Sequence, residues 1–266
     1  MAVVKAKKFL GQHFLKDLDI ARRIADTLDD FPDVPVIEVG PGMGVLTQFL
    51  IEKKRELTVV ELDRDSVPYL NEHYPALQGH IIEDDFLKLD LLKIYDNQFC
   101  VIGNYPYNIS SQIFFKVLDY KNHIPCCSGM LQKEVAERIA AKPGGKTYGI
   151  LSVLLQAWYD IEYLFTVSEK VFDPPPKVKS AVVKLVRNKR QSLDCDEKLF
   201  KTVVKTGFNQ RRKTLRNSMK PLLGKDCDAY TDPIFNERPE RLSVADFEKL
   251  TNIVAAFLPG RQDERK

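Results

Sequence analysis

The stretch VIEVGPGMGVL, residues 36–46, decides the fold. Four residues of strand character, Val36–Val39, run directly into the glycine-rich turn GPGMG at 40–44. Apolar residues at helical spacing follow the turn, at Leu46, Phe49 and Leu50. A strand, a glycine-rich turn and a helix in this order predict a unit whose backbone can approach a bound ligand closely.

Strands and helices alternate on both sides of this unit through most of the chain. Four more apolar runs predict strands, at 57–62, 80–84, 99–104 and 126–131. Helical periodicity lies between them, which indicates a parallel sheet covered by helices on both faces. Two further strands, expected at 160–167 and 179–186, have no helix between them and are expected to add as an antiparallel hairpin at the edge.

The last part of the chain has a different character. From Asp194 onward the apolar spacing is helical, and Ser243 with Asp246 forms a capping box before the final helix. We therefore predict two domains: an α/β domain over 1–188 and a smaller all-helical domain over 189–266.

Composition excludes several classes of protein. The 266 residues are 44% hydrophobic and 29% charged, which is enough to bury a core and argues against disorder. No apolar run approaches the roughly 18 residues of a membrane span, so we expect a soluble, cytoplasmic protein that does not associate with membranes. We also expect it to be a monomer. The sequence has five cysteines, of which Cys126 and Cys127 are adjacent, but no C-x-x-C pair, and its four histidines are scattered. We therefore expect neither a zinc site nor disulfides.

Basic residues gather in two segments. Residues 1–16 hold four lysines and no acid, and residues 189–220 hold ten Lys or Arg against three acids. This distribution suggests a polyanionic partner, although a charge run on a solvated face is the alternative.

Two carboxylates are expected at the ligand-binding edge of the sheet. Glu61, 21 residues after Gly40, ends the next strand, where it can accept hydrogen bonds from both hydroxyls of a ribose. Asp85 closes a third strand and can accept from an adenine amino group. The spacing predicts a nucleoside cofactor but leaves NAD, FAD and S-adenosylmethionine open, and G-x-G-x-G in place of G-x-G-x-x-G favours the last.

The tetrapeptide Asn104-Tyr105-Pro106-Tyr107 lies at the same edge. An aromatic amino nitrogen is a poor nucleophile because its lone pair is delocalised into the ring. The Asn104 amide oxygen and the Tyr105 or Pro106 carbonyl can hold its two N–H groups and favour a pyramidal nitrogen. Pro106 fixes the turn, and Tyr107 offers a face for base stacking. The alternative is a proline-broken loop with two packing tyrosines.

Taken together, GPGMG, ELD and NYPYN, with FLGQHFL before them and VFDPPPKVKSAVV and FNQRRKTLRN after them, resemble the KsgA-type ribosomal RNA adenine dimethyltransferase family. The resemblance implies a Rossmann-like domain that uses S-adenosylmethionine to dimethylate two adjacent adenines in the 3′-terminal hairpin of small-subunit ribosomal RNA. It implies a partner in the small ribosomal subunit or its precursor, during ribosome biogenesis.

The resemblance also assigns individual residues. It implies that the methyl donor is bound by His13, Leu15, Gly40, Glu61, Asp85 and Asn104. His13 stands where the family commonly has Asn, and Tyr105 where it commonly has Leu. Phe172 in FDPPPK would stack on the target adenine opposite Tyr107, so the catalytic set is Asn104, Pro106, Tyr107 and Phe172.

The RNA contact is expected at the basic run Arg211, Arg212, Lys213 and Arg216. Helical spacing would place Arg212 and Arg216 on one face, where arginines can fork onto phosphates. Lys5, Lys7 and Lys8 are either a second clamp or part of a disordered tail. Three alternatives remain: a large-subunit methyltransferase of the macrolide-resistance type, a non-catalytic assembly factor, and a Rossmann dehydrogenase, which the NYPY motif disfavours.

Overall fold

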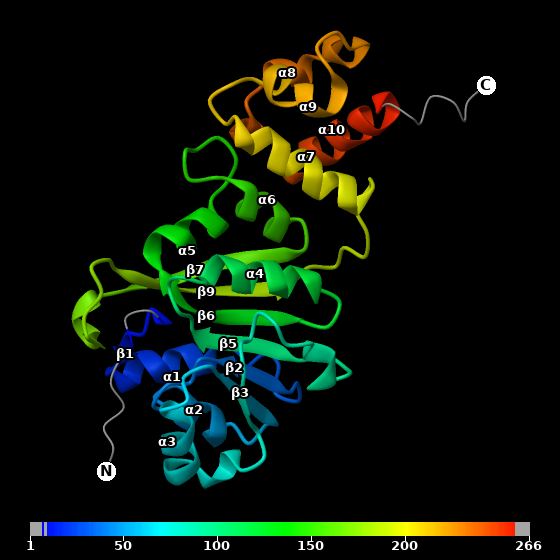
Figure 1. The fold of residues 1–266 in the computed structure, drawn as a ribbon. Coiled ribbons are helices and arrows are strands. Elements are labelled where there is room, and N and C mark those ends of the chain that lie inside the picture. Colours follow the sequence, from blue (N-terminus) through cyan, green and yellow to red (C-terminus); the bar gives the residue numbers. More distant parts are fainter. Residues whose placement is uncertain (1–6, 8–9, 259–266) are drawn as a thin grey trace. The chain divides into compact units, whose positions relative to one another are not determined.

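The computed structural model describes residues 7 and 10–258 of the chain. Within them, seven strands form one sheet in the order β4-β3-β2-β5-β6-β9-β7 (Figure 1). The strands are β2 (Val36–Val39), β3 (Leu57–Glu61), β4 (Ile81–Glu83), β5 (Cys100–Asn104), β6 (Cys126–Gln132), β7 (Tyr159–Val167) and β9 (Ser180–Arg187). The predicted α/β class is confirmed.

The chain direction in this sheet creates a crevice beside the glycine-rich turn. β2 pairs in parallel with β3 on one side and with β5 on the other, and β4 and β6 continue outward in parallel. Because the chain leaves β2 in one direction and later returns to its other side, the carboxyl ends of β2 and β5 border a gap in which ligands bind in such sheets.

The last two strands lie at the edge, as expected. β9 runs antiparallel to β6, with Met130 opposite Val182, and β7 is the outermost strand beside β9. A second, two-stranded sheet was not predicted. In it, β1 (Phe14–Leu15) pairs antiparallel with β8 (Phe172–Asp173), which joins the N-terminal segment to the proline-rich loop.

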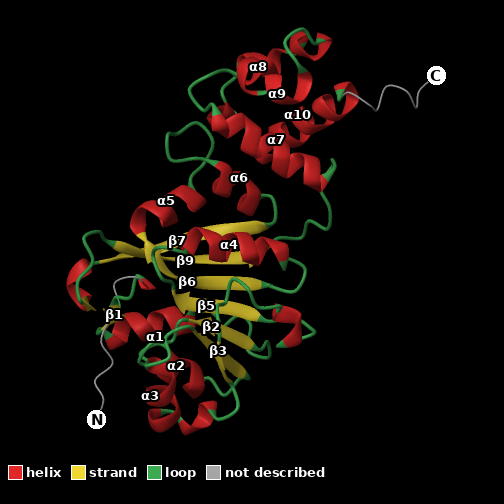
Figure 2. Ribbon diagram, viewed as in Figure 1, coloured by secondary structure: helices red, strands yellow, loops and turns green. Residues whose placement is uncertain are grey.

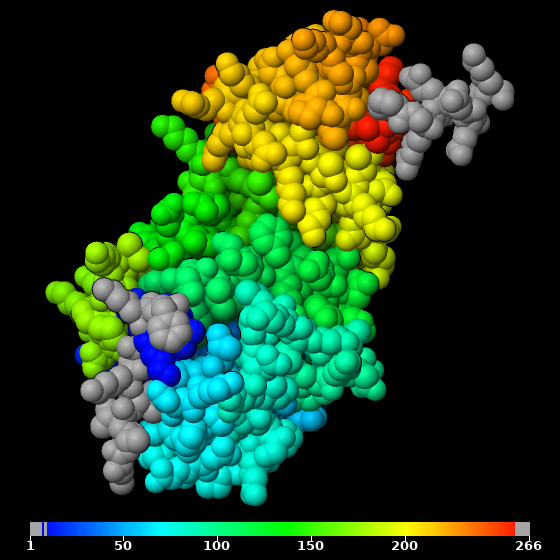
Figure 3. Space-filling model, in the orientation of Figure 1, coloured from blue at the N-terminus to red at the C-terminus, as the bar shows by residue number. Residues whose placement is uncertain are grey.

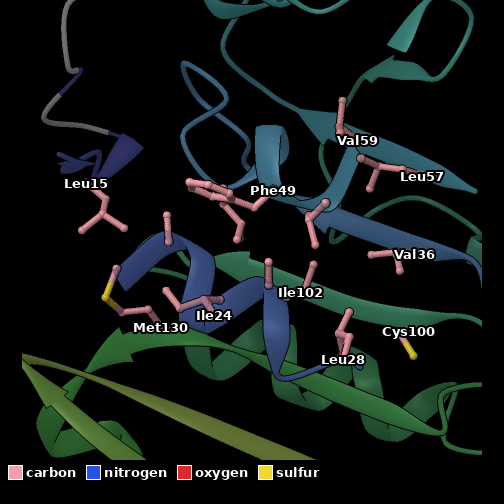
Figure 4. Close-up of a cluster of buried hydrophobic side chains, with 14 of the residues drawn as sticks. Leu15, Ile24, Leu28, Val36, Phe49, Leu57, Val59, Cys100, Ile102 and Met130 are labelled. Atoms are coloured by element: carbon pink, nitrogen blue, oxygen red, sulfur yellow. The ribbon is translucent and has the colours of Figure 1, made fainter. Parts of the chain in front are cut away.

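Helices cover the sheet (Figure 2). They are α1 (Leu18–Asp26), α2 (Thr47–Glu52), α3 (Ser66–His73), α4 (Ser110–Asp119) and α5 (Lys133–Ala140). α1 begins at Asp17, whose side chain accepts from the Ile20 N–H at 3.1 Å. Ile24 on its buried face and Leu28 just after the helix pack with Ile102 and Met130 in the cluster of Figure 4.

The structure divides the chain differently from the predicted boundary at 188. One compact unit is 1–136 with 160–187, and the other is 137–159 with 188–266. The second unit contains α6 (Ile150–Gln156), α7 (Glu197–Asn209), α8 (Leu215–Ser218), α9 (Lys220–Leu223) and α10 (Val244–Phe257). Residues 137–159 belong with the C-terminal helices because α6 packs on α7 and the Tyr148 ring meets Phe208 edge-on.

Candidate active site

A cavity of about 180 Å³ lies in the first unit, at the carboxyl ends of β2, β3 and β5. Five segments that are distant from one another in sequence line it, together with Ile24 of α1: 10–15, 38–46, 60–62, 84–87 and 104–109. This is the edge at which the sequence places the ligand-binding residues. The lining includes His13, Leu15, Gly40, Glu61, Asp85, Asn104, Pro106 and Tyr107.

The turn after β2 requires its glycines. Gly40, Gly42 and Gly44 have φ angles of 69°, 57° and 77°, which side chains rarely allow. A Cβ on Gly44 would lie 2.2 Å from the Tyr74 ring, and one on Gly42 would lie 3.0 Å from Phe14. The close approach of Phe14 and Tyr74 therefore leaves no room for a side chain at Gly42 or Gly44.

Glu61 is the carboxylate beneath this turn. Its side chain accepts the Gly42 N–H at 2.9 Å and the Asp63 N–H at 2.8 Å, and the residue is only 4% exposed. Burial raises the pKa of Glu61, and the two backbone N–H groups partly offset that rise. Each carboxylate oxygen carries a second lone pair, so both can still accept from a ligand hydroxyl.

Glu38 is a functional candidate that sequence reasoning missed. It lies within β2, lines the floor of the cavity and accepts from the Thr47 hydroxyl at 2.7 Å. Burial raises the pKa of Glu38 to about 8, so the side chain is mostly neutral at pH 7. The sequence signal that could have revealed Glu38 is an acidic residue within the otherwise apolar strand VIEV, residues 36–39.

The Asn104–Tyr107 loop forms another wall. Asn104 ends β5, and its amide nitrogen donates to the His13 carbonyl at 3.2 Å, so its amide oxygen is the group that can accept from a ligand. Tyr105 points into the core, where its hydroxyl donates to the Ser128 carbonyl at 2.7 Å. The Tyr107 hydroxyl hydrogen-bonds Ser180, and its ring centroid lies 5.3 Å from that of His13.

The N-terminal segment that lines the cavity, residues 10–15, is held in place by several side-chain contacts, as is Lys7 before it. The His13 ring donates from Nδ1 to the Pro174 carbonyl at 2.7 Å, and Gln12 donates to Asp63 at 2.9 Å. Lys7 pairs with Asp63 and, at 2.7 Å, with Asp65. In Figure 3 the segment appears in blue on the surface, against the yellow-green segment that contains Asp173.

A family model described as ribosomal RNA adenine dimethylase matches residues 3–256. The chain belongs to this family. It is 76% identical over 253 residues to a Parabacteroides distasonis protein named ribosomal RNA small subunit methyltransferase A, and the match covers 95% of each chain.

Two solved structures have the same fold. A dimethyladenosine transferase from Plasmodium falciparum superposes with a TM-score of 0.76 and 25% identity, covering 90% of this chain and 96% of that one. The 23S rRNA methyltransferase ErmE gives a TM-score of 0.65 and 25% identity, covering 91% and 99%.

One residue expected at the active site of this adenine dimethylase family member is buried in the core. Phe172 is 1% exposed and belongs to the apolar cluster with Leu15 and Ile24, and it is not part of the cavity lining. β8 pairs with β1 in the register Leu15 to Phe172, which places the ring in the core. In this structure Phe172 is thus buried beside the cavity-lining residues Leu15 and Ile24, and its stacking on the target base stays a prediction.

The basic run of this family member is also arranged differently from the prediction. α7 ends at Asn209 and α8 begins at Leu215, so residues 210–214 form a turn and the expected helical face does not exist. Arg211 donates to the carbonyls of Gly145 and Tyr148, the latter at 3.0 Å.

Arg216 donates to the Tyr230 carbonyl at 2.6 Å. Both arginines therefore hold the second unit together. Arg212 is exposed, and the exposed Lys213 lines a hollow of about 420 Å³ together with Lys220 and Lys225.

Neither a metal site nor a membrane span is present in the described part of the chain. No group of three or more His, Cys, Asp or Glu side chains in residues 7 and 10–258 could hold a metal ion. In the same residues, no helix combines the length and apolar character that crossing a bilayer requires. The expected basic residues Lys5 and Lys8 lie outside the part of the chain that the structure describes.

Proposed function

We propose that this protein transfers methyl groups from S-adenosylmethionine to the N6 atoms of two adjacent adenines in the 3′-terminal hairpin of small-subunit ribosomal RNA. The observation that carries the proposal is the juxtaposition of Asn104 and Tyr107 with Glu61 and Asp85 around one cavity. The 76% identity to a protein named as a small-subunit methyltransferase supports the choice of RNA.

The cavity residues fit this cofactor. The glycine turn offers bare backbone, Glu61 suits the ribose hydroxyls, and Asp85 suits the adenine amine. Leu15 and Gly40 contribute mainly through backbone and shape, and His13 lines the same cavity, where it can donate or accept one hydrogen bond. When bound, the cofactor supplies a methyl group on a positively charged sulfur.

The chain's own residues act on the target amine. Asn104 Oδ1 and a backbone carbonyl accept its two N–H groups and turn the nitrogen lone pair toward the methyl group. That carbonyl belongs to Tyr105 or Pro106; the Pro106 carbonyl accepts from the Ile109 N–H at 3.2 Å and keeps a second lone pair for the amine. Tyr107 provides the face for the flipped base, and His13 is the ring beside it.

Arg212 and Lys213 are our proposed phosphate-binding residues. Replacing both with Ala should weaken binding to small subunits while leaving cofactor affinity unchanged. The slope of log affinity against log salt should flatten by about 0.7–0.9 for each phosphate that the variant no longer neutralises. Equilibrium binding between low and moderate salt measures this slope.

The control for that pair is Lys189→Ala with Lys198→Ala, which removes equal charge from exposed positions elsewhere in the basic segment. An unchanged slope in the Arg212 and Lys213 variant, or an equal change in the control, would show that these positions are ordinary solvated surface. Arg211 and Arg216 are unsuitable for this test because they hold backbone carbonyls.

Labelled S-adenosylmethionine tests the whole proposal. Incubated with purified under-methylated small subunits, the protein should label two adjacent adenines near the 3′ end of the ribosomal RNA. A separate measurement of the molar mass of the protein in solution should give the value of a monomer. Large subunits or their RNA serve as the parallel substrate for the 23S alternative, which has the weaker support of 25% identity. No transfer to either particle by a protein that binds small subunits would favour a non-catalytic assembly factor.

A further inference from the structure

Lys116 is a buried lysine in α4, outside the cavity lining. It is only 9% exposed, and its ammonium donates to the Leu87 carbonyl at 3.0 Å and to the Leu89 carbonyl. Burial lowers its pKa, and it lies 5.6 Å from the centroid of the Phe86 ring. Lysine is seldom buried without a specific partner, so its contacts with this loop call for a physical reason.

The loop that Lys116 holds is the one that carries Asp85. Asp85 Oδ1 accepts the Leu87 N–H at 3.0 Å, and the Asp85 carbonyl accepts the Lys88 and Leu89 N–H groups at 2.9 and 3.3 Å. The loop is thus a tight local turn, and Lys116 donates to two of its carbonyls. Lys116 therefore helps to hold the turn from which the Asp85 side chain extends, and the Asp85 carboxylate also pairs with Lys88 at 3.4 Å.

The loop of residues 85–89 contributes to two separate cavities. Asp85 and Leu87 line the cavity described above, while Leu87 also lines a second hollow of about 670 Å³ that includes Lys116. The ammonium therefore supports the loop from its far side. It does not reach into the cavity, and so it acts on a ligand only through the loop.

The same lysine connects the loop to the target-base side of the cavity. α4 begins at Ser110, soon after the Asn104–Tyr107 loop, and the Ser110 hydroxyl donates to the Tyr107 carbonyl at 3.3 Å. Lys116 lies about two turns farther along the same helix. One rigid helix thus carries both the end of the base-binding loop and the support for Asp85.

We infer that Lys116 is a positioning residue that holds Asp85 in place to receive the 6-amino group of the cofactor's adenine, and so sets selectivity for a 6-aminopurine. The inference rests on the proposed function for the role of Asp85. It predicts an effect on purine discrimination, which general destabilisation of the fold would not produce.

The experiment compares two ligands that differ at this group, S-adenosylhomocysteine and S-inosylhomocysteine, by calorimetry on the full-length protein. The wild-type protein should prefer the adenosyl ligand by about tenfold or more, because the inosyl ligand has no amine to donate to a carboxylate. Lys116→Met should reduce that ratio by about three- to tenfold, mainly through weaker binding of the adenosyl ligand. In methyl transfer, KM for the cofactor should rise while kcat at saturation stays within about twofold.

Three variants make the result interpretable. Asp85→Ala should bring the ratio close to one; if it does not, the proposed role of Asp85 fails independently of Lys116. Lys116→Arg keeps a cation with several donors and should restore most of the ratio. Lys93→Met is the matched control, the same substitution at an exposed lysine on a neighbouring turn, and should leave the ratio unchanged.

A Lys116→Met protein that binds both ligands less tightly by the same factor would overturn the inference, since a purely structural role predicts an unchanged ratio. So would a wild-type ratio in this variant when Asp85→Ala abolishes the preference. If Lys116→Met does not fold, Lys116→Gln replaces it and is judged by the same ratio.

Discussion

Asn104→Ala is expected to lower single-turnover methyl transfer by about 10²–10³-fold at saturating cofactor, while affinity for small subunits changes little. The Asn104 amide oxygen holds the target amine most strongly as the nitrogen becomes pyramidal, so the interaction is made mainly in the transition state. Removing one preorganised polar group of this kind has effects of this size. Rapid-quench assays on under-methylated small subunits measure it.

Two comparisons separate this role from a structural one. Asn104 also donates to the His13 carbonyl, so Asn104→Asp, which keeps an acceptor but not that donor, should retain more activity than Asn104→Ala. Asn97→Ala, at an exposed position before the same strand, should be unaffected. Transfer by Asn104→Ala at a near-wild-type rate would exclude the amine-holding role.

Glu61→Ala is expected to raise the dissociation constant for S-adenosylmethionine roughly 10- to 150-fold. The carboxylate would accept hydrogen bonds from the ribose hydroxyls, and hydrogen bonds to charged groups contribute about 1.5–3 kcal/mol. The effect includes some disorder of the glycine turn, because the Gly42 and Asp63 N–H groups lose their acceptor. Calorimetric titration of a variant with a native circular-dichroism spectrum gives the value.

Glu61→Gln distinguishes the two contributions, since it keeps one carbonyl oxygen for the turn but carries no charge. We expect its affinity to lie between those of the wild type and Glu61→Ala. Glu56→Ala, exposed just before the same strand, is the control. Wild-type affinity in folded Glu61→Ala would remove Glu61 from the cofactor site.

The sheet and the cavity edge were predictable because their signals are local. Each central strand is a short apolar run, and the carboxyl ends of parallel strands meet at one edge whatever the rest of the chain does. Glu61, Asp85 and Asn104 are therefore brought together by strand order alone. Glu38 was missed because an acid within a strand can be read as an ordinary alternation of polar and apolar residues.

The features that the sequence did not reveal depend on contacts between residues far apart in the chain. The sequence alone suits Phe172 as a loop anchor in the core, and the stacking role came from the family resemblance; nothing near residue 172 indicates that β8 pairs with β1. Arg211 looks like a surface charge until its carbonyl partners 63 and 66 residues away are known. The segment 137–159 has helical and apolar patterns that suit either core, so its membership of the second unit could not be predicted.

The pairing of β1 with β8 also constrains the order of events during synthesis. Residues 14 and 15 leave the ribosome early, but their partners at 172 and 173 emerge only after about 160 more residues have been added. Closing so long a loop has an entropic cost, and it must wait for the intervening strands to bring the two segments close. A nascent chain that already contains the glycine turn, Glu61 and Asn104 thus lacks the pairing that fixes His13 and Leu15 over the cavity. We therefore expect the binding cavity to mature late on the translating ribosome, after the strands that carry the glycine turn, Glu61 and Asn104 have been made.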